Sequence, residues 1–469
     1  MPITTSGVGS GINIRELVDE LLAAESKDKK LRFDKNEAEA LTKITAYGTL
    51  SSSLSELKDK VSSLKDTNPF AQRSVTTAKS TDGKTALTAS ASNSAQTGDF
   101  QVEVTALAKS HKLASGNFDS AATVVGTGVI EFTVGTTVYS IEITDSDNTL
   151  QGIKDKINES SKTTGIAASL ITSDSGAVLV FQALETGLDK VFTVAVVGDG
   201  DSNDTDNAGL SKLASNHLTI NQPGQDASVK IDGVTVTNST NTLVDAIEGV
   251  TIDLLNMNTL DPVEMTISLN KDAATQAIID FVNVYNSTLE SIQKLTAYNK
   301  EDPKNAGLLI GDAITRSAQN QMRRVLNTSN YELPLAISSL AQMGITSDRT
   351  TGKLEVDTYK LSSAVSKNYD DVGKLFIDDD KGILNNLEST LDSYIELNGI
   401  IKTKTKGLNK SIDLISEQRV VLERHLIQLE ERLLTQFIAM DSIVANLRST
   451  SDFLKTQLDS LAEPLSFRK

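Results

Sequence analysis

The feature that most constrains this 469-residue chain is its C-terminal stretch, in which residues 408–463 include no glycine and no proline. Alternating steps of four and three residues from Leu408 to Leu461 meet sixteen positions, of which twelve are apolar. This spacing predicts a continuous helix with a coiled-coil seam, on the order of 80 Å long if the helix is straight. Such a helix cannot bury its apolar stripe alone and therefore needs a partner helix. Four seam positions are polar: Arg419, Gln436, Thr450 and Gln457.

Two further apolar repeats lie near the N-terminus, after a Gly/Ser stretch at residues 6–11. The first predicts an amphipathic helix with one apolar face, made of Ile14, Leu17, Val18, Leu21 and Leu22. A charged stretch, residues 25–39, separates this helix from a second seam that Asn68-Pro69 ends. The second seam consists of Leu50, Leu54, Leu57, Val61 and Leu64. The N-terminal helix of the same chain and the C-terminal helices of neighbouring copies are the candidate partners of the long C-terminal helix.

Between residues 75 and 269 the apolar period changes to two, which is typical of strands with one buried face. Asp232-Gly233 sits between two alternating runs and predicts a hairpin turn. Residues 125–216 form a candidate inserted module that carries 5 basic and 13 acidic residues. Its predicted elements are strands around 130–143, 167–171, 178–181 and 191–197, and a helix capped near Asn148 or Thr149 that runs to about Ser160.

Helical periodicity returns after Asp272, a candidate N-cap, and a further helix is predicted to start at Asp312. A short αβ segment covers residues 340–365. The predicted fold class is therefore α+β and multidomain, with helical coiled-coil ends and a helical bundle leg that bracket two nested β-rich head domains. The predicted domains are an N-terminal coiled-coil or disordered leg segment (1–39), a helical leg domain (40–71 plus 271–400), a β-rich head domain (72–124 plus 217–270), an inserted outer head domain (125–216) and a C-terminal coiled-coil segment (401–469).

The charge of the chain is unevenly distributed. Residues 1–39 sum to −2 and residues 401–469 to +2, so the net charge of −17 lies in residues 40–400. Neutral ends pack against copies of themselves more readily than acidic ones, whereas an acidic chain is not expected to bind nucleic acid. No run of about 18 apolar residues is present, so we expect no membrane span. The opening residues lack the features of a Sec-type signal, and we expect export by another route.

No catalytic constellation is visible in the sequence, and we expect no enzyme activity, no cofactor and no metal. The absence of cysteine excludes disulfides and thiolate chemistry. His111, His217 and His425 are far apart in sequence, and we expect solvated positions in loops or on helix faces. The acidic loop 199–206 departs from the EF-hand pattern, so we expect a solvated acidic loop rather than a calcium site.

Several segments resemble the flagellar filament-cap family (FliD, or flagellar hook-associated protein 2). The resemblance runs in order along nearly the whole chain, and its main segments are SGVGSGINIRELVDELLAAE, NPFAQRSVTTA, GDFQVEVTALAKSHKLAS, TDSDNTLQGIKDKIN, DASVKIDGVTVTNSTNTLVDAIEGVTIDLL and MGITSDRTTGKLEVD. It implies a structural cap at the distal tip of the bacterial flagellar filament. This cap retains exported flagellin and promotes its folding and polymerisation.

The resemblance also implies partners and a location. The implied partners are other copies of the chain in a ring of about five subunits, flagellin, the hook–filament junction proteins and a flagellar export chaperone. The implied location is the filament tip, reached through the flagellar type III apparatus. The candidate residues for self-assembly, filament or chaperone contact lie on the two helical ends: Ile14, Leu17, Val18, Leu21, Leu22, Leu422, Leu426, Leu429, Leu433, Met440, Ile443 and Leu447.

Two other functions stay open at this point. A hook–filament junction protein or a flagellin also has paired helical ends, although the Gly-Val-Gly-Ser-Gly opening is not typical of flagellin. A flagellar adhesin would bind host mucin or glycans through its head domains, but aromatic residues make up only 4% of the chain, which weakens sugar stacking.

Overall fold

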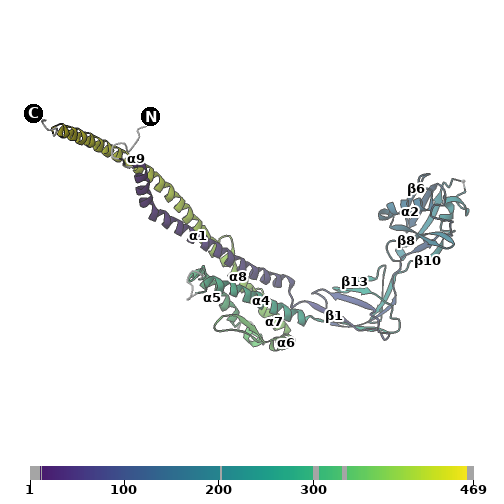
Figure 1. Ribbon diagram of the computed structural model, residues 1–469. Helices are drawn as coiled ribbons and strands as arrows, with labels where there is room; N and C mark the ends of the chain where they lie inside the picture. Colours follow the sequence, from purple (N-terminus) through teal and green to yellow (C-terminus); the bar gives the residue numbers. More distant parts are fainter. Residues whose placement is uncertain (1–10, 12, 201–202, 299–305, 330–334, 462–469) are drawn as a thin grey trace, which may run out of the picture. The chain divides into compact units, whose positions relative to one another are not determined.

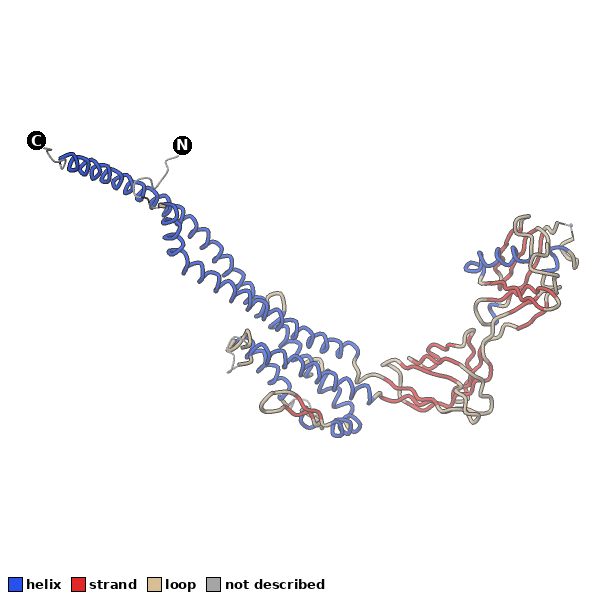
Figure 2. Tube along the Cα trace, viewed as in Figure 1, coloured by secondary structure: helices blue, strands red, loops and turns tan. Residues whose placement is uncertain are grey.

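A computed structural model of the chain describes residues 11, 13–200, 203–298, 306–329 and 335–461. The chain divides into two compact units, of which the first comprises Met1–Thr67 and Thr275–Lys469 and the second Asn68–Ala274. The first unit is mostly helical and the second is mostly β-structure (Figures 1 and 2). The prediction of an α+β multidomain fold is therefore confirmed.

The first unit is built around two long helices and a group of shorter elements. Its elements are α1 (Ile14–Thr67), α4 (Lys271–Thr296), α5 (Ala313–Asn327), the 3-10 helix η4 (Leu340–Met343), β16 (Ile345–Ser347), β17 (Leu354–Val356), α6 (Thr358–Lys367), α7 (Tyr369–Ile377), α8 (Ile383–Ile395) and α9 (Ile400–Leu461). As predicted, α1 ends just before Asn68-Pro69. The predicted long C-terminal helix is present as α9, which begins eight residues earlier than expected.

The prediction that residues 25–39 separate two helices is wrong, because α1 runs through them without a break. Residues 13–47 contain no glycine or proline, and oppositely charged residues four positions apart stabilise the helix. Lys29 Nζ, for example, lies 2.8 Å from Glu25 Oε1. The charges therefore belong to the solvated face of one 54-residue helix.

The C-terminal half of α1 forms the core of a helical bundle. The seam residues Leu50, Leu54 and Leu57 are fully buried, and α8 and α9 pack against the same helix. The buried Tyr47 hydroxyl donates to Asp312 Oδ2 (2.7 Å). Asp312 Oδ1 in turn accepts the backbone N–H of Thr315, which confirms Asp312 as the start of α5.

The predicted cap of α4 is wrong by two residues. Asn270 rather than Asp272 occupies the capping position, because the Asn270 side-chain oxygen accepts the backbone N–H of Ala273 (2.9 Å). Asp272 lies in the first turn instead, where its charge still favours the helix N-terminus.

The second unit contains two hydrophobic cores. The first core lies between a five-stranded sheet of order β1-β15-β3-β11-β12 and a three-stranded sheet of order β13-β14-β2. Its strands are β1 (Arg73–Thr77), β2 (Leu87–Ala91), β3 (Gly98–Ala106), β11 (Ala227–Ile231), β12 (Val234–Asn238), β13 (Thr242–Ile247), β14 (Val250–Leu254) and β15 (Val263–Leu269). Asp232 (φ 49°) and Gly233 (φ 83°) join β11 to β12 in the predicted hairpin turn.

The second core lies between a four-stranded sheet of order β10-β4-β8-β7 and a three-stranded sheet of order β6-β5-β9. Its elements are β4 (Lys112–Ala114), β5 (Gly128–Val134), β6 (Thr137–Ile143), α2 (Leu150–Glu159), α3 (Ser161–Thr164), β7 (Ile166–Ser173), β8 (Gly176–Ala183), β9 (Phe192–Val197), the 3-10 helix η2 (Gly209–Leu213) and β10 (Thr219–Gln222). Thr149 caps α2 with its hydroxyl, as the sequence predicted.

The second core is larger than the predicted insert of residues 125–216. Strand β4 pairs with β8 and β10, so residues 112–114 and 219–222 pair within the sheets of this core. Leu113 and Phe118 are buried in the same core. The physical reason is that β8 needs a hydrogen-bonding neighbour on the side away from β7, and β4 provides it.

Two polar residues of the second core, His111 and Asp199, are buried although solvated positions were expected for them. His111 is buried rather than solvated, and its Nδ1 accepts the backbone N–H of Phe192 (3.2 Å). Asp199, at the start of the acidic loop, is also buried and accepts the backbone N–H of Ser211 (2.8 Å). Among the described residues, no group of three or more metal-ligating side chains is placed to hold an ion, and no helix is long and apolar enough to cross a membrane.

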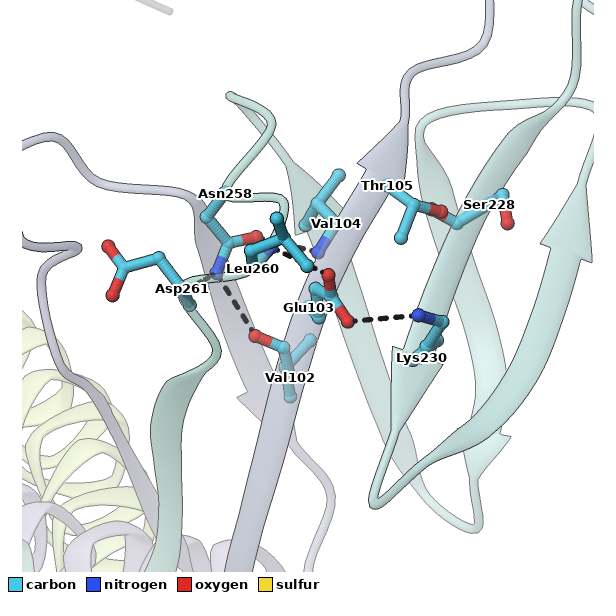
Figure 3. Close-up of polar contacts among 9 residues, drawn as sticks. All are labelled: Val102, Glu103, Val104, Thr105, Ser228, Lys230, Asn258, Leu260 and Asp261. Atoms are coloured by element: carbon cyan, nitrogen blue, oxygen red, sulfur yellow. Dashed lines mark hydrogen bonds and ion pairs between the residues drawn. The ribbon is translucent and has the colours of Figure 1, made fainter.

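A buried asparagine holds a loop against the first core (Figure 3). The Asn258 side chain accepts the N–H of Val104 (2.6 Å) and donates to the carbonyl of Val102 (3.1 Å). Two residues later, the N–H of Leu260 donates to Glu103 Oε1 (2.7 Å). These bonds hold Leu260 in a left-handed conformation (φ 64°) with its side chain 90% exposed.

Candidate assembly surface

The N-terminal half of α1 packs against α9 as an antiparallel helix pair (Figure 1). Phe33 of α1 is buried against Ile415, Leu422 and Leu426 of α9. Ala40, later in α1, lies close to residues 408–415, which come earlier in α9. The two helices therefore run in opposite directions, and the N-terminal helix is the partner of α9 within the chain.

An ion pair crosses the helix pair at the first polar break in the seam. Arg419 Nη2 lies 2.6 Å from Glu37 Oε2 and 2.8 Å from Asp34 Oδ1. The Arg419 side chain is 35% exposed, so the net stabilisation of this pair is small. Its contribution is to register, because sliding the helices by one turn would separate the guanidinium from both carboxylates.

The predicted contact residues of the N-terminal helix divide into buried and exposed sets. Ile14 and Val18 are buried, and Leu22 is half-buried on the same face four residues further on. Leu17 is half-buried, whereas Leu21 lies at the edge of the pair with 42% of its surface exposed. Ile14 and Val18 therefore already have a partner within this chain, and Leu21 is available to another molecule.

The predicted contact residues of α9 also change character along the helix. Leu422 is buried, and the next three, Leu426, Leu429 and Leu433, are half-buried. Met440, Ile443 and Leu447 are exposed by 45%, 60% and 64%.

The reason for this change is the mismatch between helix and heptad periods. A straight helix turns by about 20° per heptad relative to a strict seven-residue repeat. Past Leu433 the half-buried positions are therefore Leu434, Phe437, Asp441, Val444 and Ala445, none of which is a seam position. The seam rotates away from α1 and becomes an exposed apolar face.

The last part of α9 continues past the start of α1 (Figure 1). All described side chains at residues 446–460 are exposed, and four of them are large and apolar: Leu447, Phe453, Leu454 and Leu458. Phe453 and Leu458 lie off the heptad seam, and sequence reasoning missed them. Spacing could have found Leu458, because it follows Leu454 by four residues and therefore shares its face.

Comparison with known proteins identifies the family. The models for the N-terminus and the C-terminus of flagellar hook-associated protein 2 match residues 10–111 and 224–449. Flagellar hook-associated protein 2 of Escherichia coli (strain K12) is 30% identical over 472 residues, covering 98% of each chain. The chain belongs to the flagellar hook-associated protein 2 family. The B-type flagellar hook-associated protein 2 of Pseudomonas aeruginosa is likewise 30% identical, over 97% of each chain.

A solved structure extends the match to three dimensions. The crystal structure of the flagellar cap protein FliD D1-D2-D3 domains from Escherichia coli aligns with a TM-score of 0.62 and 31% identity, covering 78% of this chain and 99% of that one. The predicted resemblance to the filament-cap family is thus confirmed. Flagellar hook-associated protein 2 is a structural family of the bacterial flagellum and not a known enzyme family. The two family models leave out residues 112–223, which contain almost all of the second core.

Proposed function

We propose that this flagellar hook-associated protein 2 caps the distal tip of the flagellar filament, where it retains exported flagellin and promotes its folding and polymerisation. Family membership over nearly the full length supports this function. The observation that carries it is the apolar end of α9, which no other described part of the chain covers, because a cap must attach to the filament and to its neighbours through some surface. The chain supplies no catalytic group to this surface and acts by binding.

The binding step is helix packing. The exposed residues Leu447, Leu454 and Leu458 lie in a segment that α1 does not cover. An apolar helical stripe of this kind gains stability by packing against another helix. We assign an export chaperone to this stripe inside the cell. At the tip, flagellin or junction proteins and other copies of the chain take its place.

The ring and the export route follow from the same proposal. Copies of the chain form a ring of about five subunits, in which the neutral ends lie close together without strong repulsion. Export occurs through the flagellar type III apparatus. A chain without cysteine has no disulfide that would hinder threading through a narrow channel.

The test is complementation of a motile strain whose own cap protein has been deleted. The L447D/L454D variant places two charges on the exposed stripe, and S449D/T456D places two charges with the same spacing on the opposite face of α9. Burying an unpaired carboxylate costs several kcal/mol, so only the first variant should lose helix packing.

We expect cells with L447D/L454D to lack filaments and to release flagellin into the medium, while cells with S449D/T456D grow filaments. The amount of each variant in the medium separates a defect in export from a defect at the tip. Normal filaments in cells that export L447D/L454D as their sole cap protein would contradict the assignment of this surface.

A further inference from the structure

A pocket of about 330 Å³ lies within the helical unit, far in sequence from the helix pair. It is formed by the C-terminal end of α5, the 3-10 helix η4 and the β16–β17 hairpin. Its lining combines two arginines, Arg323 and Arg349, with hydroxyl groups and an apolar floor. The apolar floor consists of the buried residues Leu326, Leu340 and Ile345.

The position of Arg323 depends on a glycine. Gly352 has a left-handed backbone (φ 75°), and a Cβ atom there would lie 3.2 Å from the guanidinium carbon of Arg323. The missing side chain therefore leaves room for the guanidinium to lie flat against the hairpin turn. This contact holds the charged group at the pocket instead of leaving it free in solvent.

Neither guanidinium has an ion-pair partner among the residues that the structure describes. The pKa of Asp348 is lowered mainly by a hydrogen bond from Thr351, and the charge of nearby Arg323 lowers it further. The Asp348 Oδ1 atom accepts the N–H groups of both Thr350 and Thr351. Asp348 is thus occupied with the hairpin turn, and no other acidic side chain among the described residues pairs with the two arginines.

The local charge is opposite to that of the whole chain. Residues 313–353 carry five basic and two acidic residues, whereas the chain carries −17. Basic residues at a helix C-terminus commonly complement the helix dipole, and Arg324 in the same turn of α5 is placed to do this. Arg324 is exposed and does not line the pocket. The helix dipole therefore explains Arg324, but it does not explain why Arg323 and Arg349 line the pocket.

We infer that this pocket binds the carboxylate of an acidic side chain that a partner protein presents beside an apolar residue. The planar donor forks of arginine match the two oxygens of a carboxylate. The hydroxyl group of Ser339 adds a neutral donor at the wall, whereas the hydroxyl group of Ser347 donates to the carbonyl of Gly352 (3.4 Å). The apolar floor accepts a neighbouring aliphatic side chain. The volume corresponds to about ten water molecules, which exceeds the size of a single small ion and suits a short peptide segment.

The test uses the full chain and a fluorescein-labelled peptide, Gly-Gly-Leu-Glu-Leu-amide, followed by fluorescence anisotropy in about 0.05 M salt so that screening stays weak. A peptide with glutamine in place of glutamate is the matched probe. The variants are R323Q and R349Q, with R324Q as the control, since it removes the same charge one residue away outside the pocket. Inorganic sulfate serves as the competitor.

We expect the glutamate peptide to bind at least tenfold more tightly than the glutamine peptide. R323Q and R349Q should each weaken binding at least tenfold, and R324Q should change it less than twofold. Equal binding of the two peptides, or equal losses in R323Q and R324Q, would overturn the assignment. Displacement of the peptide by sulfate at the peptide's own concentration would also overturn it, because the pocket would then recognise oxyanions in general.

Discussion

The helix pair can be tested by removing the one aromatic side chain in its centre. Phe33 is buried on α1 and packs against Ile415 and Leu422 of α9. Phenylalanine-to-alanine changes in protein cores cost about 3–5 kcal/mol. A two-helix contact is covered on fewer sides than a domain core, so we take the lower figure of about 3 kcal/mol for F33A. This corresponds to a change of about a hundredfold in the equilibrium between the paired and the open helices.

Hydrogen exchange followed by mass spectrometry measures this equilibrium locally. In F33A we expect amides of residues 14–40 to exchange about a hundredfold faster, because local opening controls their protection. Amides of residues 50–64 and of the β-rich unit should keep their rates, since neither region contacts Phe33. L31A is the control, because Leu31 lies on the same helix but is 56% exposed. Equal acceleration in F33A and L31A, or none in F33A, would refute the assignment of Phe33 to the pairing contact.

Two further predictions concern the β-rich unit. L260G should raise the free energy of unfolding, measured by urea denaturation, by about 0.5–1 kcal/mol. The reason is that glycine tolerates φ 64° and that the exposed Leu260 side chain contributes little packing. A destabilised variant would mean that the Leu260 side chain does contribute packing. Burial lowers the pKa of His111 below its ordinary value of 6.5, so stability is full above that pH and falls as the pH drops below it. The second core should therefore melt at lower temperature at pH 5 than at pH 7, and H111Q, which keeps an acceptor for the Phe192 N–H without a titrating group, should reduce this difference.

Regular spacing made much of the fold predictable from the sequence. The hairpin at Asp232-Gly233, the Thr149 cap and the Asp312 cap each depend on residues adjacent in the chain, so local chemistry was sufficient. The size of the second core was not predictable in this way. The three-residue strand β4 is too short to show a period, and it is a strand only because β8 and β10 lie on either side of it.

The same distinction applies to buried polar residues. His111 and Asp199 are surrounded in sequence by polar or flexible residues, which favoured the expectation of solvated positions. Their burial depends on partners that fold over them from elsewhere, namely the Phe192 N–H and the Ser211 N–H. A sequence window cannot show these partners, because each arises from the sheet topology or from the path of a loop.

The candidate assembly surface shows how a correct period can still misplace the contacts. A strict heptad predicts that every seam residue from Leu408 to Leu461 lies against one partner, but α9 follows the helix period and the seam rotates away from α1 beyond Leu433. The two helices pair in one register, in which Arg419 lies against Asp34 and Glu37. In this register α1 contacts only the first part of the seam, so the last part needs a different partner. The first part closes the chain on itself, and the last part remains exposed for another molecule. Because α1 begins at Ile14, it does not cover residues 446–460 of α9, and an extended α1 would hide the surface to which we assign binding.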